Sequence, residues 1–195
     1  LLHGNRGRIT AEQVQAGINP LDDHKPITSL VALENTCNKG GGSCYEIADI
    51  QRIKKICKSF KLALHLDGAR LWNAMVARQE TALQHGALFD SISVCLSKGM
   101  GAPIGSLLLG NTTFIKKARR IRKVLGGGMR QAGYLAAAGL YAIEHHFPLL
   151  AKDHEHAAAV ANVLSSKSWI KEILPVETNI VIFKPTDHMP TPLLV

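Results

Sequence analysis

Short apolar runs alternate with amphipathic stretches along most of the chain. The runs of buried-strand type are residues 29–34, 62–66, 91–96 and 105–109. Within residues 45–60, Ile47, Ile50 and Ile53 recur at helical spacing, which predicts an amphipathic helix. Further helices are predicted at residues 10–16, 70–77, 81–85 and 112–125, the first of them capped by Thr10.

Strands that alternate with helices, and that are apolar on both faces, indicate an α/β fold with a mainly parallel sheet covered by helices on both sides. Further along, helices are predicted at residues 129–145 and 148–164, and strands at 169–174 and 179–183. We interpret residues 1–150 as a large domain and residues 151–195 as the beginning of a smaller one, because two short strands do not complete a domain. The chain is therefore expected to be a fragment, cut at both ends.

Polar residues follow three of the predicted strands. Glu34 and Asn35 end the first strand, Asp67 ends the second, and Lys98 follows the third. In parallel sheets of this kind, ligands bind beyond the carboxyl ends of the strands. We therefore expect these residues to converge on one rim of the sheet.

Three residues at this rim are candidates for chemistry, and each also has a plainer explanation. Lys98 is either a nucleophile, with Gly99 and Gly101 leaving room beside its amine for a bulky ligand, or a surface lysine in a turn. Asp67 is either an acid beside a ligand cation or a helix N-cap. Arg70 suits a carboxylate bound through two hydrogen bonds, or a local ion pair with Asp67.

The second half of the chain contains a basic run between Lys116 and Lys123. It fits a solvated helix face, a nucleic-acid-binding surface or a few contacts to a small phosphate. Three glycines at 126–128 then lead to Arg130, in a loop that either approaches an anion or acts as a flexible turn. His24 lies in a loop before the first strand, where a lone histidine is usually exposed.

Composition narrows the class of protein. The 195 residues are 46% hydrophobic and 19% charged, with a formal charge of +8, which is ordinary for a globular protein with a core. The four cysteines show no metal-ligand spacing and indicate a reducing cytoplasm; no metal site is predicted. No apolar run is long enough for a membrane span, and no Gly-x-Gly-x-x-Gly follows the first strand, which disfavours a dinucleotide-binding dehydrogenase.

Four stretches in one order make a more specific pattern than any single motif. They are LENTCNKGGG, HLDGARLWNA, SVCLSKGMGAPIGSLLLG and ARRIRKVLGGGMRQAGYLAAAGLYA. Together they resemble the low-specificity L-threonine aldolase family, whose members use pyridoxal 5′-phosphate (PLP) and share the aspartate-aminotransferase-like fold. The resemblance covers roughly residues 20–162.

The resemblance implies roles for the rim residues. Lys98 would be the Schiff-base lysine that binds PLP, and Asp67 would pair with the pyridine nitrogen. Arg70 would hold the carboxylate of an amino-acid substrate. His24 corresponds to a histidine that interacts with the substrate hydroxyl. Many members have a histidine where this chain has Cys37, so Cys37 is assigned no role.

The resemblance also implies an assembly and a reaction. Lys123 and Arg130 would lie near the cofactor phosphate, one or both acting across the interface of a homodimer or homotetramer. The reaction would be cleavage of a β-hydroxy-α-amino acid to glycine and an aldehyde. Because the family's remaining N- and C-terminal parts complete the pocket, the isolated chain is expected to be inactive or poorly folded. Two alternatives stay open, namely β-elimination on the same scaffold and nucleic-acid binding by residues 116–123.

Overall fold

The computed structural model of the chain describes residues 1–187. The first half contains α1 (Ala11–Ala16), β1 (Leu30–Glu34), α2 (Ile47–Ser59), β2 (Ala63–Gly68), α3 (Leu71–Arg78), α4 (Ala82–Leu88) and β3 (Ser91–Cys95). The second half contains β4 (Ser106–Gly110), α5 (Thr112–Val124), α6 (Gly133–Tyr141), the π-helical turn η1 (Ala142–His146), the 3-10 turn η2 (Phe147–Leu149), α7 (Leu150–Ser165), β5 (Ile170–Ile173) and β6 (Phe183–Pro185).

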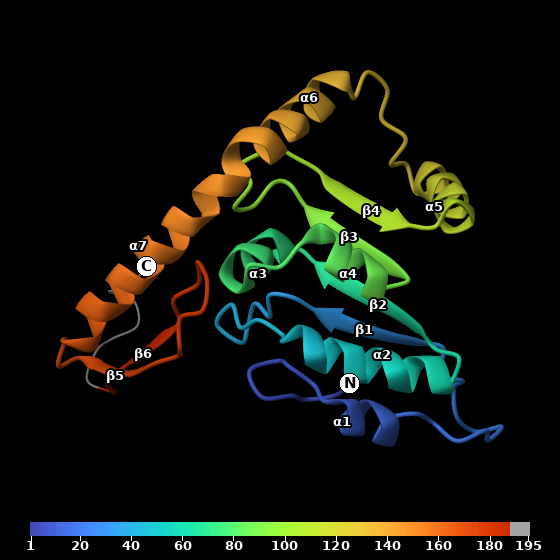
Figure 1. The fold of residues 1–195 in the computed structure, drawn as a ribbon, viewed down its shortest axis with the longest axis horizontal. Helices are drawn as coiled ribbons and strands as arrows, with labels where there is room; N and C mark the ends of the chain where they lie inside the picture. Colours follow the sequence, from blue (N-terminus) through green and yellow to red (C-terminus); the bar gives the residue numbers. More distant parts are fainter. Residues whose placement is uncertain (188–195) are drawn as a thin grey trace.

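The main sheet has four strands in the order β1-β2-β3-β4. The pairs β1–β2 and β2–β3 are parallel, whereas β4 runs antiparallel to β3. Figure 1 shows β1, β2 and β3 pointing the same way, with α2, α3 and α4 as the connecting helices and β4 pointing back. A mainly parallel sheet flanked by helices confirms the predicted fold class. The remaining strands, β5 and β6, form a separate antiparallel pair.

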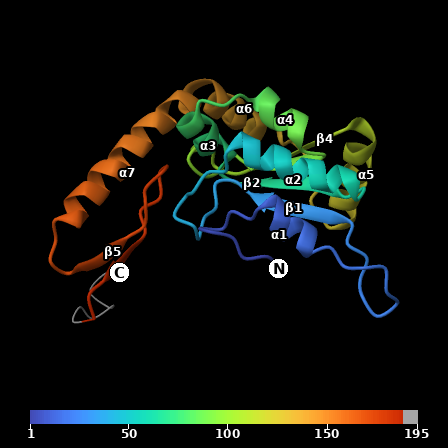
Figure 2. The same cartoon turned by 60° about the horizontal axis from the view of Figure 1, so that its bottom comes forward.

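One face of the main sheet carries the core. Leu64 and Leu66 of β2 are fully buried, together with Ile50 and Ile53 of α2, and α2, α3 and α4 lie on the same side of the sheet (Figure 2). Side chains that alternate with the buried ones point to the other face of the sheet and are more exposed. In β1, for example, exposed and buried positions alternate. The strands are therefore less uniformly buried than their apolar sequences suggested, and their second face is largely open in the described residues.

Local signals account for several element boundaries. Thr10 caps α1 and Thr81 caps α4, each in a reciprocal capping box with the glutamine three residues later. Such a cap stabilises a helix by about 1 kcal/mol. At the end of β2, a Cβ on Gly68 would lie 2.7 Å from the Ser93 carbonyl oxygen, so only glycine lets β2 and β3 approach this closely. The prediction of short helices at these two capped sites is confirmed.

Two predicted elements are wrong in their bounds. Helix α6 begins at Gly133 rather than at residue 129, because α5 ends with Gly126 in a left-handed conformation and Gln131 has a φ of 51°. The last strand is Phe183–Pro185 rather than residues 179–183, and the segment before it is held to the loop after β1, where the Thr178 hydroxyl donates to the Gly42 carbonyl. The division into domains at residues 1–150 and 151–195 stays a prediction.

We expect the thiols to differ in reactivity. Burial raises the pKa of Cys37 to about 11 and that of Cys44 to about 12. Because alkylation requires the thiolate, both should react with iodoacetamide at pH 8 more slowly than half-buried Cys95, by a factor of about a hundred or more, and Cys44 should be the slower of the two. Peptide mass spectrometry of the native protein measures the three rates, with denaturant as the control that should equalise them. Equal rates in the native protein would contradict the burial of Cys37 and Cys44.

Candidate active site

Asp67 lies at the carboxyl end of β2. It is in register with Glu34 of β1 and Ser93 of β3, and its carbonyl oxygen accepts a hydrogen bond from the Asn35 N–H at 3.0 Å. The exposed side chain is oriented by its own chain, because Oδ1 accepts from the Ala69 N–H at 3.0 Å. Asp67 is not the N-cap of α3, which is Arg70. The carboxylate thus stands on the open face of the sheet, at its rim.

Lys98 is carried by a tight turn beyond β3. The Gly101 N–H donates to the Lys98 carbonyl at 2.8 Å, and the Ala102 N–H donates to the Leu96 carbonyl at 3.0 Å. The turn is anchored by Met100, which is buried, whereas the Lys98 side chain is exposed. The hydrogen-bonded turn therefore places the Lys98 amine beyond the end of β3, and β3 is the strand next to β2, which carries Asp67.

The two glycines beside Lys98 pack against other parts of the chain. A Cβ on Gly99 would lie 2.9 Å from Leu150 Cδ2, and a Cβ on Gly101 would lie 3.1 Å from His146 Nδ1. Both positions face the helical segment that contains η1 and α7. The glycines thus make room for protein side chains of the same chain, while room for a ligand beside the Lys98 amine stays a prediction.

Arg70 completes the group at the rim. It is half-buried and immediately precedes α3, three residues after Asp67. Helix α3 is fixed to the end of β3 by a hydrogen bond from Trp72 Nε1 to the Cys95 carbonyl at 2.9 Å. The structure therefore brings Asp67, Arg70 and Lys98 to one edge, and it shows no ion pair between Asp67 and Arg70 within the described chain.

His24 lies elsewhere. It belongs to the loop between α1 and β1, which hydrogen bonds from Asn19 to Thr28 and to Pro26 close at the amino end of β1. Figures 1 and 2 show this loop projecting away from the arrowheads of the parallel strands. The His24 side chain is 94% exposed and pairs with Asp22. Within one chain, the structure does not bring His24 to the rim that carries Lys98.

Lys123 and Arg130 are also separate from this rim. Lys123 is in the last turn of α5, and Arg130 is in the exposed connection between α5 and α6. Because β4 runs antiparallel, α5 begins at the opposite edge of the sheet from Lys98 (Figure 1). The three glycines end α5 rather than start α6, since Gly127 donates to the Arg122 carbonyl at 2.8 Å. The anion site expected at a helix N-terminus here is therefore not formed by these glycines.

Sequence reasoning missed a charged cluster close to the rim. The carboxylate of half-buried Glu177 accepts from Arg6 at 2.5 Å and from Arg78 at 3.0 Å, and Arg8 lies 3.9 Å away. It also accepts from the Cys44 N–H at 3.1 Å. The cluster fastens the segment between β5 and β6 to the loop that follows β1. No local motif marks these residues, because Arg6 and Glu177 are 171 positions apart.

Cys37 lies in that same loop. It is 2% exposed, and its thiol donates to the Glu34 carbonyl at 3.0 Å. Burial also raises its pKa to about 11. A protonated and enclosed thiol is a poor nucleophile, which agrees with assigning Cys37 no chemical role.

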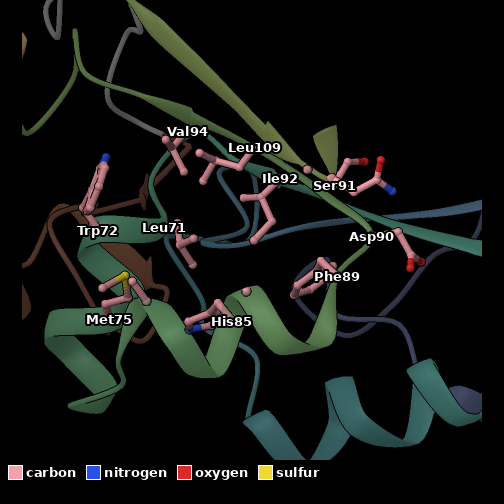
Figure 3. A pocket seen from close by; sticks show the side chains of 14 residues that line it. Leu71, Trp72, Met75, His85, Phe89, Asp90, Ser91, Ile92, Val94 and Leu109 are labelled. Carbon is pink, nitrogen blue, oxygen red and sulfur yellow. The ribbon is translucent and has the colours of Figure 1, made fainter. Parts of the chain in front are cut away.

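A cavity of about 460 Å³ lies on the helix-covered side of the sheet (Figure 3). Its walls are mainly apolar and include Leu71, Met75, Phe89, Ile92 and Val94. Buried His85 of α4 is also in the wall and lies 2.8 Å from the Glu80 carboxylate. None of the predicted site residues lines this cavity, so it is distinct from the rim.

The part of the chain that the structure describes has neither a metal-ligand cluster nor a helix suited to span a membrane. Residues 1–187 contain no cluster of three or more histidine, cysteine or acidic side chains arranged to hold a metal ion. No helix among them combines the length and the apolar character needed to cross a membrane.

Comparisons with known proteins relate the chain to beta-eliminating lyases and, among them, to threonine aldolases. The family model described as beta-eliminating lyase matches residues 1–187. The chain is 42% identical over 184 residues to low-specificity L-threonine aldolase 1 of Arabidopsis thaliana, and 41% identical over 180 residues to the low-specificity L-threonine aldolase of Saccharomyces cerevisiae. These alignments cover 93% and 91% of the chain but 51% and 46% of the relatives. The chain thus spans about half the length of the curated relatives it matches.

The solved structures point the same way. A candidate L-allo-threonine aldolase from Listeria monocytogenes superposes with a TM-score of 0.77 at 28% sequence identity. The match covers 92% of this chain and 48% of that one. The arrangement of β1 to β4 and their helices is therefore an arrangement found in solved structures of this group.

Removing the Glu177 carboxylate should loosen the rim. Glu177→Ala leaves Arg6, Arg78 and the Cys44 N–H without their shared acceptor, and we expect the free energy of unfolding to fall by about 1–3 kcal/mol. Denaturant unfolding of the protein measures the change. Glu172→Ala, at an exposed position of β5, is the matched control and should change it by less than about 0.5 kcal/mol. Equal effects of the two substitutions would argue against the cluster.

Proposed function

The chain belongs to the beta-eliminating lyase family, and from that membership we propose that the protein is a PLP-dependent aldolase. The proposed substrates are L-threonine, L-allo-threonine and related β-hydroxy-α-amino acids, which it would cleave to glycine and an aldehyde. The main support is the rim itself, where Asp67 lies at the end of β2, Lys98 follows the neighbouring parallel strand β3, and Arg70 precedes α3. Identity above 40% to proteins named low-specificity L-threonine aldolases adds to it.

The residues at the rim fit PLP by their chemistry. An exposed amine, an oriented carboxylate and a guanidinium occupy one edge of the sheet. When bound, PLP supplies a pyridine ring that withdraws electrons from the carbon framework of the substrate. Lys98 would hold the cofactor through its amine. The Asp67 carboxylate would keep the proton on the pyridine nitrogen, because a nearby negative charge favours the protonated cation.

Arg70 is proposed to bind the substrate carboxylate. Its guanidinium offers two parallel N–H donors in the geometry that a carboxylate accepts. Its position just before α3, three residues after Asp67, would fix the substrate relative to the acid. In this role Arg70 would orient the bond to be broken without taking part in proton transfer.

Lys123 and Arg130 are proposed to reach the cofactor phosphate from a second subunit. Within one chain they lie away from Lys98, and many apolar side chains around them are exposed, including Ile121, Val124, Leu125, Met129 and Tyr134. Exposed apolar patches of this kind mark interaction surfaces. We therefore propose a homo-oligomer, a dimer or a tetramer, and a cytoplasmic location that suits four free cysteines.

The lysine assignment is tested by Lys98→Ala in the protein prepared with PLP. We expect the visible absorbance of the bound cofactor to disappear and the release of glycine and acetaldehyde from threonine to stop, because no amine remains to hold the cofactor. Lys55→Ala, at an exposed position of α2, is the control and should change neither measurement. An unchanged spectrum would exclude Lys98. Formation of 2-oxobutanoate by the unsubstituted protein would indicate β-elimination in place of aldol cleavage.

The position of His24 leads to a separate prediction. Because its loop lies at the amino ends of the parallel strands, we expect His24→Ala to change kcat/KM by no more than about twofold, as for a surface substitution. Steady-state kinetics with threonine measure the effect. A fall of about a hundredfold, the scale of lost general-base catalysis, would contradict this expectation and place His24 in the site of a neighbouring subunit.

A further inference from the structure

The turn that carries Lys98 is held from outside the sheet by a histidine. His146 of η1 places Nδ1 2.7 Å from the Met100 carbonyl oxygen. A carbonyl oxygen only accepts, so Nδ1 carries the proton and donates. The imidazole approaches this closely because Gly101, with a φ of 70°, has no side chain in its way.

A second histidine is hydrogen-bonded to an asparagine that lies beside the turn. Asn73 of α3 is 2% exposed, and its Nδ2 lies 3.1 Å from His154 Nε2 of α7. An amide nitrogen only donates, so His154 accepts through Nε2 in its neutral form. Burial lowers the pKa of His154, which favours that form. The same amide borders the turn, since a Cβ on Gly99 would lie 3.4 Å from Asn73 Oδ1.

The helical segment presents these contacts from one side. Leu150 and His154 are four residues apart in α7, a spacing that places their side chains on the same helix face, and His146 reaches the turn from η1. Leu150 is fully buried and would lie 2.9 Å from a Cβ on Gly99. The neighbouring His145 and His156 are exposed. This helical segment thus packs against Gly99, Met100 and Gly101 of the turn.

We infer that Asn73, His146 and His154 are positioning residues for Lys98. His146 bonds the backbone of the turn that carries this lysine, and His154 holds the Asn73 amide that packs beside Gly99. The role of Lys98 in this inference rests on the proposed function, whereas the fastening of the turn does not. A lysine amine sits on a flexible four-carbon stem, so its place in the site depends on where its backbone is held. A displacement of about 1 Å in a reacting group costs on the order of a hundredfold in rate.

The first experiment measures the turn without the cofactor. In the full-length protein freed of PLP, hydrogen exchange of the Gly101 and Ala102 amides reports the opening of the turn. His146→Leu keeps much of the side-chain bulk and removes the donor, whereas His146→Asn keeps a donor close to the place of Nδ1. We expect about five- to tenfold faster exchange in His146→Leu, the effect of one lost hydrogen bond, and a rate close to that of the unsubstituted protein in His146→Asn.

The second histidine is tested in the same way. His154→Met removes the acceptor, and His154→Gln retains one that can receive the Asn73 amide. Faster exchange in the first and recovery in the second are expected, while His145→Ala and His156→Ala should have no effect. Equal exchange in His146→Leu and His146→Asn would overturn the inference. So would an acceleration that is as large in the β1–β2 core as in the turn, because that would be a general loss of stability.

Kinetics of the PLP-loaded protein complete the test. We expect kcat with threonine to fall about ten- to a hundredfold in His146→Leu, with KM little changed and with recovery in His146→Asn. Unchanged kcat beside faster exchange would overturn the positioning role. A protein without aldolase activity in any form would instead refute the proposed function, and the exchange measurements would remain valid.

Discussion

The parallel pairing of β1, β2 and β3 is the constraint on which the candidate site depends. Backbone hydrogen bonds hold Glu34, Asp67 and Ser93 in one row across the sheet. Since parallel strands end at the same edge, the segments that follow them must emerge together. The Lys98 turn and the start of α3 therefore share one rim, although the residues that they carry are about thirty positions apart along the chain.

The two faces of the main sheet differ in burial: one contributes the core, and the other carries the candidate site. The face under α2, α3 and α4 contains the fully buried Leu64 and Leu66 and supplies most of the hydrophobic stabilisation. The other face carries Asp67 and remains open within the described residues. Apolar side chains of α5 and of its following connection are also exposed. The chain thus has a buried hydrophobic core on one side of the sheet and, on the other side, an exposed surface suited to contact with more of the polypeptide or with another subunit.

Contacts that are distant in sequence hold the rim in shape. Glu177 joins Arg6 and Arg78 to the loop after β1, and His146 bonds the turn that carries Lys98. Each of these contacts links the later helical and hairpin segments to the edge of the main sheet. The later part of the chain therefore supports the candidate site without supplying any of the three groups, Asp67, Arg70 and Lys98, to which we assign chemistry.

The sequence by itself determined the α/β class, the helix capped by Thr10, the short helix near residues 81–85 and the convergence of Asp67 and Lys98, because periodicity, caps and strand ends are local and follow from short-range hydrogen bonding and burial. It also indicated a family, through motifs that are continuous in the chain. Only the tertiary structure showed that the glycines beside Lys98 accommodate Leu150 and His146, that His24 lies at the other end of the strands, and that Glu177 gathers three arginines. These features depend on packing between segments far apart in the chain, which no local pattern encodes.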